Sequence, residues 1–458
     1  MQVQWWSIIP FVTLLACIAV LPLVPATAHA WERNRLKLTV ALLLGVPIAV
    51  WFIAAGAGVE VVHALVEYGQ FIILLLALFV VSGGIFLSGD IRATPRNNTI
   101  FLALGGVIAS FIGTTGAAML LIRPLLNTNS ERNHKAHTVV FTIFIVANCG
   151  GLLTPLGDPP LFLGMLRGVP FEWTLTLFPQ WLFVNVLLLA TYYGLDRRAY
   201  AAETPEAIAS DESQRSPLGL RGAVNLVFFA MIIAAVAFAP SVDLHAIETG
   251  HAAWHQFVPW RELVMLAAGA MSYFLGDRVA RFELNQFSWT PILEVAALFI
   301  GIFLTMIPAL NFLGQIADRL PLNRITVFIF TGGISGVLDN SPTYATFFEI
   351  ASRFPGEPRV ADVPEVLLTS VALGAVLGGA LTYIGNGPNF MVKSVADAVG
   401  VETPSFGGYV VQSLTYLVPV FAAMALIFLT DAWLWRGLGI AIAAALLLRA
   451  ALLARRHR

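Results

Sequence analysis

The sequence predicts an all-α polytopic membrane protein with about eleven transmembrane helices and two re-entrant hairpins arranged in inverted-topology repeats. Three observations lead to this prediction. Of 458 residues, 58% are hydrophobic and only 12% are charged, whereas an ordinary soluble domain has about 25% charged residues. Apolar runs of about 20 residues, the length that crosses a bilayer, recur along the chain. Finally, two parts of the chain repeat each other.

The expected spans are apolar runs bounded by charges, prolines or glycines. They cover residues 7–28, 36–56, 71–88, 138–164, 176–195, 222–239, 259–276, 291–307, 365–396, 411–430 and 434–453. Two further apolar stretches, 100–126 and 325–350, are interrupted near the middle by the sequences GTTG and DNSP. Each stretch is therefore expected to form two half-helices of a re-entrant hairpin.

The basic residues in short loops predict the orientation, because Lys and Arg are enriched on the cytoplasmic side. Eleven spans with the N-terminus outside place all the following groups inside: Arg33, Arg35 and Lys37; Arg92 and Arg96; Arg197 and Arg198; Arg278 and Arg281; Arg455, Arg456 and Arg458. This agreement requires that both interrupted stretches return to the side they start from. We expect an integral protein of the bacterial inner membrane with a cytoplasmic C-terminus.

Composition excludes several other classes of protein. The 26 basic and 27 acidic residues leave a formal charge of -1, with no basic surplus for nucleic acid. Both cysteines, Cys17 and Cys149, lie in apolar runs, which argues against a disulfide framework. No P-loop occurs, so we expect no ATP, no cofactor and energy from ion gradients. The A-x-A sequence at 28–30 resembles a cleavage site, but no basic residue precedes it, so the first span is expected to be retained.

An internal repeat links the two halves of the chain. The segments GGLLTPLGDPPLFL at 150–163 and GGALTYIGNGPNFM at 378–391 are identical at seven of fourteen positions. An interrupted hairpin precedes each copy and an unbroken span follows it. In the orientation above, one unit starts outside and the other inside. Inverted repeats with interrupted helices that meet near the midplane are typical of secondary transporters.

The repeat also divides the chain into segments. We expect N-terminal scaffold spans at 1–70, a first repeat unit at 71–195 and a cytoplasmic, solvated linker at 196–221. Further scaffold spans are expected at 222–290, a second repeat unit at 291–430, and a last span with a basic tail at 431–458. The interrupted helices within the units are 138–164 and 365–396.

Oxygen-bearing side chains are concentrated at the four interruptions. Non-helical backbone at membrane depth persists only where it is buried in protein or lines a cavity, and it exposes half-helix ends that attract ions. The first half offers Thr114, Thr115, Asn148, Thr154 and Asp158, and the second offers Asp339, Asn340, Ser341, Thr343, Thr382, Asn386 and Asn389. With no thiolate cluster among them, this set suits a hard cation such as Na⁺.

Asp158 and Asp339 are the two acidic residues within the interruptions, and ionisable groups at that depth are functional candidates. A carboxylate that binds Na⁺ and H⁺ in competition couples the two flows. Simpler roles stay open: Asp158 precedes two prolines and can cap a half-helix, and Glu294 either complements a helix dipole or serves a proton pathway. Arg123, in the first hairpin, either pairs with a carboxylate or reaches the cytoplasmic interface.

Three segments carry a family resemblance. Residues 148–164, 335–344 and 383–393 resemble the NhaD-type sodium/proton antiporters and the citrate-transporter-like permeases of the ion transporter superfamily. The resemblance implies a homodimer whose protomers have a scaffold domain and a transport domain that moves like an elevator. It also implies a role for Ser335, and Na⁺ ligation by Asn148, Asp158, Asp339 and Asn340. One departure is the first hairpin tip, where this chain has Gly-Thr-Thr in place of an Asp-Asn pair.

The leading functional prediction is sodium/proton antiport without enzymatic activity, in which Na⁺ and H⁺ are the transported or coupling ions. The alternatives are cation-coupled symport of citrate or a dicarboxylate, and efflux of arsenite or an oxyanion. A hypothesis of another class is an intramembrane aspartyl protease, since two membrane aspartates can share a proton. The sequence PLGD at Asp158 lacks the first glycine of the GxGD motif, which argues against it.

Overall fold

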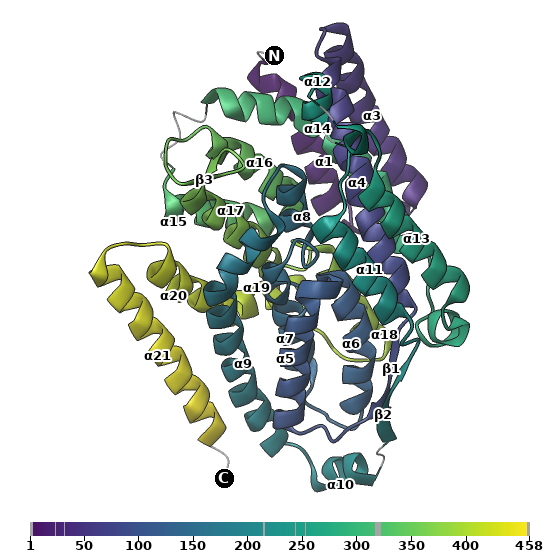
Figure 1. The fold of residues 1–458 in the computed structure, drawn as a ribbon. Helices are drawn as coiled ribbons and strands as arrows, with labels where there is room; N and C mark the ends of the chain where they lie inside the picture. Colours follow the sequence, from purple (N-terminus) through teal and green to yellow (C-terminus); the bar gives the residue numbers. More distant parts are fainter. Residues whose placement is uncertain are drawn as a thin grey trace.

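The computed structural model describes residues 3–455, except 23, 32, 214–215, 243, 252 and 317–321. This described part is mostly helical, with two short two-stranded sheets (Figure 1). Seven of its helices are long and apolar enough to cross a membrane: 34–54, 58–83, 136–153, 171–201, 290–312, 406–428 and 433–455. Shorter apolar helices cover 5–18, 225–238, 324–335 and 365–381. The prediction of an all-α polytopic membrane protein is confirmed.

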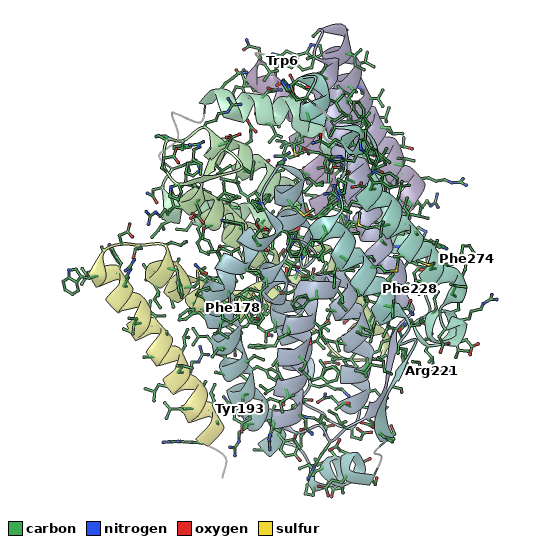
Figure 2. The ribbon with its side chains drawn as sticks, in the orientation of Figure 1. Trp6, Phe178, Tyr193, Arg221, Phe228 and Phe274 are labelled. Atoms are coloured by element: carbon green, nitrogen blue, oxygen red, sulfur yellow. The ribbon has the colours of Figure 1, made fainter. Side chains whose placement is uncertain are left out.

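The outer surface carries large apolar side chains, as expected for helices that face lipid. Trp6, Phe178 and Phe274 are 52%, 49% and 76% exposed, and Trp6 and Phe274 lie at the edge of the helical body in Figure 2. By contrast, the interrupted helix 136–153 is 89% buried. The interruptions therefore lie inside protein, where the sequence analysis places them.

The N-terminal segment differs from the predicted spans at two places. It forms η1 (Trp5–Ile8), α1 (Ile9–Val20), α2 (Pro25–Trp31), α3 (Asn34–Ala54) and α4 (Gly58–Gly83). The expected first span is thus two helices. The expected boundary at residue 70 falls inside α4, because polar residues of its first half, such as Glu60 and Glu67, line a cavity between helices and not a loop.

The two repeat units share one order of parts: a hairpin, an interrupted helix and a further apolar helix. The first contains α5 (Pro95–Ile112), α6 (Thr114–Thr128), α7 (Ala136–Ile145), η2 (Cys149–Leu153), α8 (Pro159–Leu166), η3 (Phe171–Leu177) and α9 (Phe178–Ala201), and follows α4 and β1 (Phe86–Asp90). The second contains α14 (Thr290–Ile316), α15 (Arg324–Ser335), α16 (Asn340–Ser352), β3 (Arg359–Val360), β4 (Val363–Pro364), α17 (Glu365–Gly378), η7 (Gly379–Leu381), α18 (Gly387–Ala398), α19 (Phe406–Gln412), η8 (Ser413–Leu417) and α20 (Val418–Phe428). The hairpins are therefore α5–α6 and α15–α16.

Equivalent backbone contacts join each hairpin to its interrupted helix. A Cβ atom added at Gly150 would lie 2.6 Å from the carbonyl oxygen of Gly106, and one at Gly378 would lie 2.4 Å from that of Gly332. Thr154 donates a hydrogen bond to the carbonyl of Ser110, and Thr382 donates at 2.5 Å to that of Gly336. Both units thus use glycine to bring two backbones together and threonine to join them, as duplication predicts.

The segment expected as a solvated linker has its own structure. The helix α9 continues to Ala201, and α10 (Pro205–Ser213) and β2 (Ser216–Arg221) follow. The strand β2 pairs antiparallel with β1. Asp196, Glu203 and Asp211 are at most 9% exposed, because they accept hydrogen bonds from the first hairpin region, including the backbone N–H of Asn133. The segment is therefore folded and anchored by these three carboxylates, while most of its other described residues are exposed or partly exposed.

The remaining helices flank the repeats. They are α11 (Asn225–Phe238), α12 (Leu244–Glu248), η4 (Trp254–Phe257), α13 (Trp260–Leu275), η5 (Val279–Leu284) and the C-terminal α21 (Trp433–Arg455). The helix α13 packs against α4 and α11, whereas α14 packs against α3. The helix α21 packs against α9 and α20 at the edge of the molecule (Figure 1). Arg456 and Arg458, which the predicted orientation uses, lie outside the described residues.

Candidate functional site

The four interruptions meet at the carboxylate of Asp158, which precedes α8. Its Oδ1 accepts hydrogen bonds from the Thr114 hydroxyl at 3.0 Å and from the Asn386 amide at 3.3 Å. Its Oδ2 accepts a hydrogen bond from the Asn340 amide at 2.6 Å. Thr114 and Asn340 begin the second arms of the two hairpins, and Asn386 directly precedes α18. One carboxylate of the first unit therefore contacts both hairpins and the second interrupted helix.

The backbone turns the same way at both hairpin tips. Gly113 has φ 83° and ψ 148°, and Asp339 has φ 74° and ψ 140°. Glycine adopts positive φ freely, whereas a non-glycine residue there is strained, a feature that is concentrated at functional sites. Gly113 and Asp339 are thus equivalent positions, which explains how the first tip keeps its shape without an acidic residue.

Asp158 and Asn386 are equivalent residues in the duplicated segments, 228 positions apart. Both are extended residues that precede a half-helix with proline in its first turn, and neither side chain caps that helix. The structure therefore does not show the capping role that remained open for Asp158. Its side chain contacts residues of other helices.

A chain of amides continues from the carboxylate through the second interruption. The Asn386 amide also donates to Oδ1 of Asn148 at 3.1 Å, and the Asn148 amide donates to Oδ1 of Asn389 at 2.7 Å. Asn389 in turn donates to the carbonyl oxygens of Gly379 at 2.8 Å and Thr382 at 2.9 Å. Because these asparagines are buried, the hydrogen-bond network leaves the polar groups around Asp158 few alternative orientations.

The charge of Asp158 has no protein partner among the described residues. The side chain is 1% exposed, and the hydrogen bonds that it accepts come from one hydroxyl and two amides. Burying an ionised carboxylate without a counter-charge costs several kcal/mol, roughly, even when it is hydrogen-bonded. A proton or a bound cation at this position relieves that cost. The carboxylate and the Thr114 hydroxyl oxygen beside it are ligand types that suit a hard cation, and the described residues include no cluster of His, Cys, Asp and Glu for a transition metal.

Asp339 has a different environment. Its Oδ1 accepts a hydrogen bond from the backbone N–H of Ser341 at 3.1 Å and so caps α16. Thr343 donates at 2.8 Å to the Asp339 carbonyl, and Ser341 donates at 3.3 Å to Oδ1 of Asn340. These three residues therefore shape the hairpin tip and orient Asn340, and no described hydrogen bond joins the two aspartates.

Several predicted site residues lie away from Asp158. Ser335 donates at 2.6 Å to the carbonyl of Ala375, and Thr154 and Thr382 make the equivalent hairpin contacts described above. Thr115 lines a cavity on the side of α4. Glu294 forms an ion pair with Lys37 at 2.6 Å, so its described partner is a buried scaffold cation and not a member of the site.

Sequence reasoning missed Ser110, a buried residue of α5. Its hydroxyl donates to the carbonyl of Gly150 and accepts from the backbone N–H of Leu153 at 3.4 Å. Ser110 lies three residues before Gly113, as Gly336 lies three residues before Asp339. An alignment of the two hairpin sequences at Gly113 and Asp339 places Ser110 opposite Gly336, and this comparison could have pointed to Ser110.

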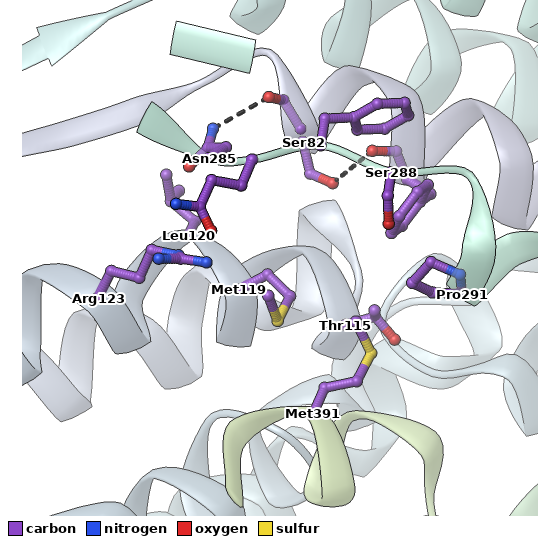
Figure 3. A pocket seen from close by; sticks show the side chains of 13 residues that line it. Ser82, Thr115, Met119, Leu120, Arg123, Asn285, Ser288, Pro291 and Met391 are labelled. Atoms are coloured by element: carbon purple, nitrogen blue, oxygen red, sulfur yellow. Dashed lines mark hydrogen bonds between the residues drawn. The ribbon is translucent and has the colours of Figure 1, made fainter. Parts of the chain in front are cut away.

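Two cavities lie between α4 and helices of the hairpins and interrupted helices. The first, the basic cavity, has a volume of about 130 Å³ and lies between α4, α6, α18 and the segment 285–291 (Figure 3). The second, the acidic cavity, has a volume of about 570 Å³ and lies between α4, α14, α16 and the end of α8. Arg123 is the charged residue that lines the basic cavity. Glu60, His63, Glu67, Arg167, Glu349 and Asp362 line the acidic cavity.

Duplicated hairpins and interrupted helices that meet at a buried carboxylate are the architecture of a membrane transporter built from two repeats. A family model described as "Putative citrate transport" matches residues 1–429, and the chain belongs to this citrate-transporter-like family. The protein is similar to an uncharacterized transporter of Mycobacterium bovis, with 28% identity over 332 residues, 68% of this chain and 71% of the relative. It is also similar to a 46 kDa membrane protein of Mycobacterium leprae, with 26% identity over 319 residues and the same coverage.

Proposed function

We propose that this transporter is a sodium/proton antiporter in which Asp158 binds Na⁺ and H⁺ in competition. The observation that carries the proposal is the buried Asp158 carboxylate, which has no counter-charge among the described residues and which contacts all the other interruptions. A cation at Asp158 would also interact with the elements that hold Thr114, Asn340 and Asn386. Its arrival or loss would therefore change how strongly both repeat units are held together.

Transport requires the site to open to each side in turn. We propose that the repeat units move relative to the flanking helices, as in an elevator, and that the basic and acidic cavities are the two access routes. The cavities support this proposal because the second helix of each hairpin lines one of them, and opposite ends of α4 line the two. The orientation that the basic loops predict places the basic cavity on the cytoplasmic side and the C-terminus inside. We also propose a homodimer in the inner membrane, which native mass spectrometry of the purified protein tests.

The direct experiment uses proteoliposomes with an imposed pH gradient and a fluorescent pH indicator. Addition of Na⁺ should collapse the gradient for the wild-type protein, and the Asp158→Asn variant should leave it intact. Asp397→Asn, which removes a carboxylate near the end of α18 that pairs with Lys393, is the matched control and should retain exchange. A wild-type protein that leaves the gradient unchanged with Na⁺, Li⁺ and K⁺ would contradict the proposed antiport.

Family membership favours a second candidate, cation-coupled symport of citrate or a dicarboxylate. In this reaction Asp158 would hold the coupling cation while the anion moves with it. Uptake of labelled citrate that depends on an inward Na⁺ or H⁺ gradient would favour symport. Exchange of Na⁺ for H⁺ without any carboxylate present would favour antiport.

A further inference from the structure

The basic cavity combines polar and apolar walls at one end of the helical body. Arg123, Thr115 and Gln286 contribute polar side chains, and Phe79 and Met391 are among the apolar residues that line it (Figure 3). None of the described residues that line it is acidic. The orientation that the basic loops predict places this cavity on the cytoplasmic side, where anionic lipid headgroups give the membrane surface a negative potential.

Arg123 differs from other enclosed arginines in lacking a partner. In the described part of the chain it makes no hydrogen bond or ion pair, whereas Arg132 pairs with Asp196 at 2.7 Å. Arg281, which is 1% exposed, donates to main-chain carbonyl oxygens in the last turns of α4 and α13, and the dipoles of those helices offset its charge. Arg123 has neither kind of partner, so its five N–H groups are available to an anion from outside the chain.

Other hydrogen-bond donors of the cavity are also unpaired. Gln286 adopts φ 49°, a conformation that is strained for a residue with a side chain. Its amide forms no hydrogen bond with the described residues, whereas the amide of its neighbour Asn285 donates to the carbonyl oxygens of Gly83 and Ile85. An amide and a guanidinium therefore both line this cavity with donors that the described part of the protein does not use.

Exposed apolar side chains adjoin the cavity on two sides. Trp289, which is 40% exposed, lies in the segment that closes one side, and Phe390, which is 59% exposed, directly precedes Met391 on α18. The ring of Trp289 lies 5.4 Å from that of Tyr273, and Trp and Tyr are concentrated where a membrane protein meets the lipid interface. A ligand with a charged head and an apolar tail therefore fits this place.

We propose that the basic cavity binds the phosphate headgroup of an anionic phospholipid through the guanidinium of Arg123, with the acyl chains on the apolar surface beside it. Arg binds phosphate through paired hydrogen bonds, and basic pockets between membrane helices bind anionic headgroups. A volume of about 130 Å³ corresponds to roughly four water molecules at ~30 Å³ each, which accommodates a phosphate group but not the acyl chains. The inference goes beyond the proposed antiport, since lipid binding does not involve Asp158.

A headgroup in this cavity would contact several elements at once. The helices α6 and α18 line one side, and the end of α4 and the segment 285–291 line the other. The lipid would therefore hold these elements together in the conformation described here, and it would have to leave before the cytoplasmic route opens. This consequence rests on the proposed function, whereas the binding itself does not.

The test is native mass spectrometry of the full chain in detergent, with phosphatidylglycerol or phosphatidylcholine added at equal concentrations. The wild type should retain phosphatidylglycerol preferentially. Arg123→Gln should bind it about tenfold more weakly or worse, because hydrogen bonds between charged groups are worth at least that factor. Arg123→Lys should keep part of the affinity, since an ammonium group also binds phosphate. Arg35→Gln is the matched control: it removes an exposed arginine on the same predicted side and should bind as the wild type does.

Several results would overturn the proposal. These are an unchanged affinity for phosphatidylglycerol in folded Arg123→Gln, an equal loss in Arg35→Gln, and equal retention of phosphatidylcholine by the wild type. Displacement of the lipid by inorganic phosphate at comparable concentrations would indicate a site for a free anion instead. Thermal melting reports whether each variant is folded.

A second variant keeps the test decisive if Arg123→Gln does not fold. Gln286→Gly removes the amide donor and relieves the strained φ, because glycine adopts positive φ freely. It should therefore fold and bind phosphatidylglycerol several-fold more weakly, and unchanged binding would contradict the site. Asp158→Asn, which should abolish the proposed exchange, should bind the lipid as the wild type does, so failure of the lipid site and failure of antiport are separate results.

Discussion

We predict that substitutions of the two intramembrane aspartates have opposite effects on the stabilisation of the folded protein by Na⁺. A cation that binds the folded protein alone stabilises it by RT ln(1 + [Na⁺]/Kd), about 2.7 kcal/mol when Na⁺ is at roughly 100 times its Kd. Because Asp158 contacts three interruptions, the Asp158→Asn variant should lose this gain. Asp339→Asn should retain it, since the amide oxygen of Asn can still accept the hydrogen bond from Ser341 that caps α16.

The stability of Asp158→Asn without Na⁺ follows from the same contacts. In Asp158→Asn, the amide nitrogen would face one of the groups that now donate a hydrogen bond to the Asp158 carboxylate. Leaving that buried donor without an acceptor costs about 1–3 kcal/mol. Removing an uncompensated buried charge offsets this cost, because such charges are themselves destabilising. We therefore expect the Na⁺-free melting temperatures of the variant and the wild type to lie close together.

The assay is thermal unfolding in detergent across a Na⁺ titration, with choline replacing Na⁺ to hold the ionic strength constant. Wild type and Asp339→Asn should show a melting temperature that rises with Na⁺, and Asp158→Asn a flat response. A Na⁺ response retained in Asp158→Asn and lost in Asp339→Asn would refute the assignment of the site to Asp158.

Two further predictions concern packing and pH. Gly378→Ala should lower the melting temperature, because its Cβ would lie 2.4 Å from the carbonyl of Gly332; Gly333→Ala, with no atom within 4 Å, should be neutral or slightly stabilising. Burial opposes ionisation of Glu203, but the backbone N–H groups of Asn133 and the next residue overcome it and hold its pKa below the usual value. Its contribution to stability should be present above pH about 4.5 and decline as the pH falls through the lowered pKa. Melting from pH 7 to pH 3 should show a smaller decline for Glu203→Gln, and an identical decline would contradict this role.

The pattern of spans, hairpins and interruptions was readable because each depends on local sequence. Apolar runs of membrane length and breaks at GTTG and DNSP identify helices and their ends without reference to the rest of the chain. The first half of α4 was not predicted as helical, because its polar residues interrupt the apolar pattern. Glu60, His63 and Glu67 resemble loop residues in sequence, and only their position beside the acidic cavity explains them as helical.

The pairing of the site residues required tertiary structure. The sequence by itself determined the class of fold, the duplication and the set of oxygen-bearing residues, since these follow from composition, periodicity and self-similarity. It identified both Asp158 and Asp339 as candidates and left a capping role open for Asp158 alone. The fold decided that Asp158 faces Thr114, Asn340 and Asn386 while Asp339 caps its own helix. That difference depends on how two hairpins and two interrupted helices converge, and contacts such as that between Asp158 and Asn386, 228 positions apart, are not encoded in any local pattern.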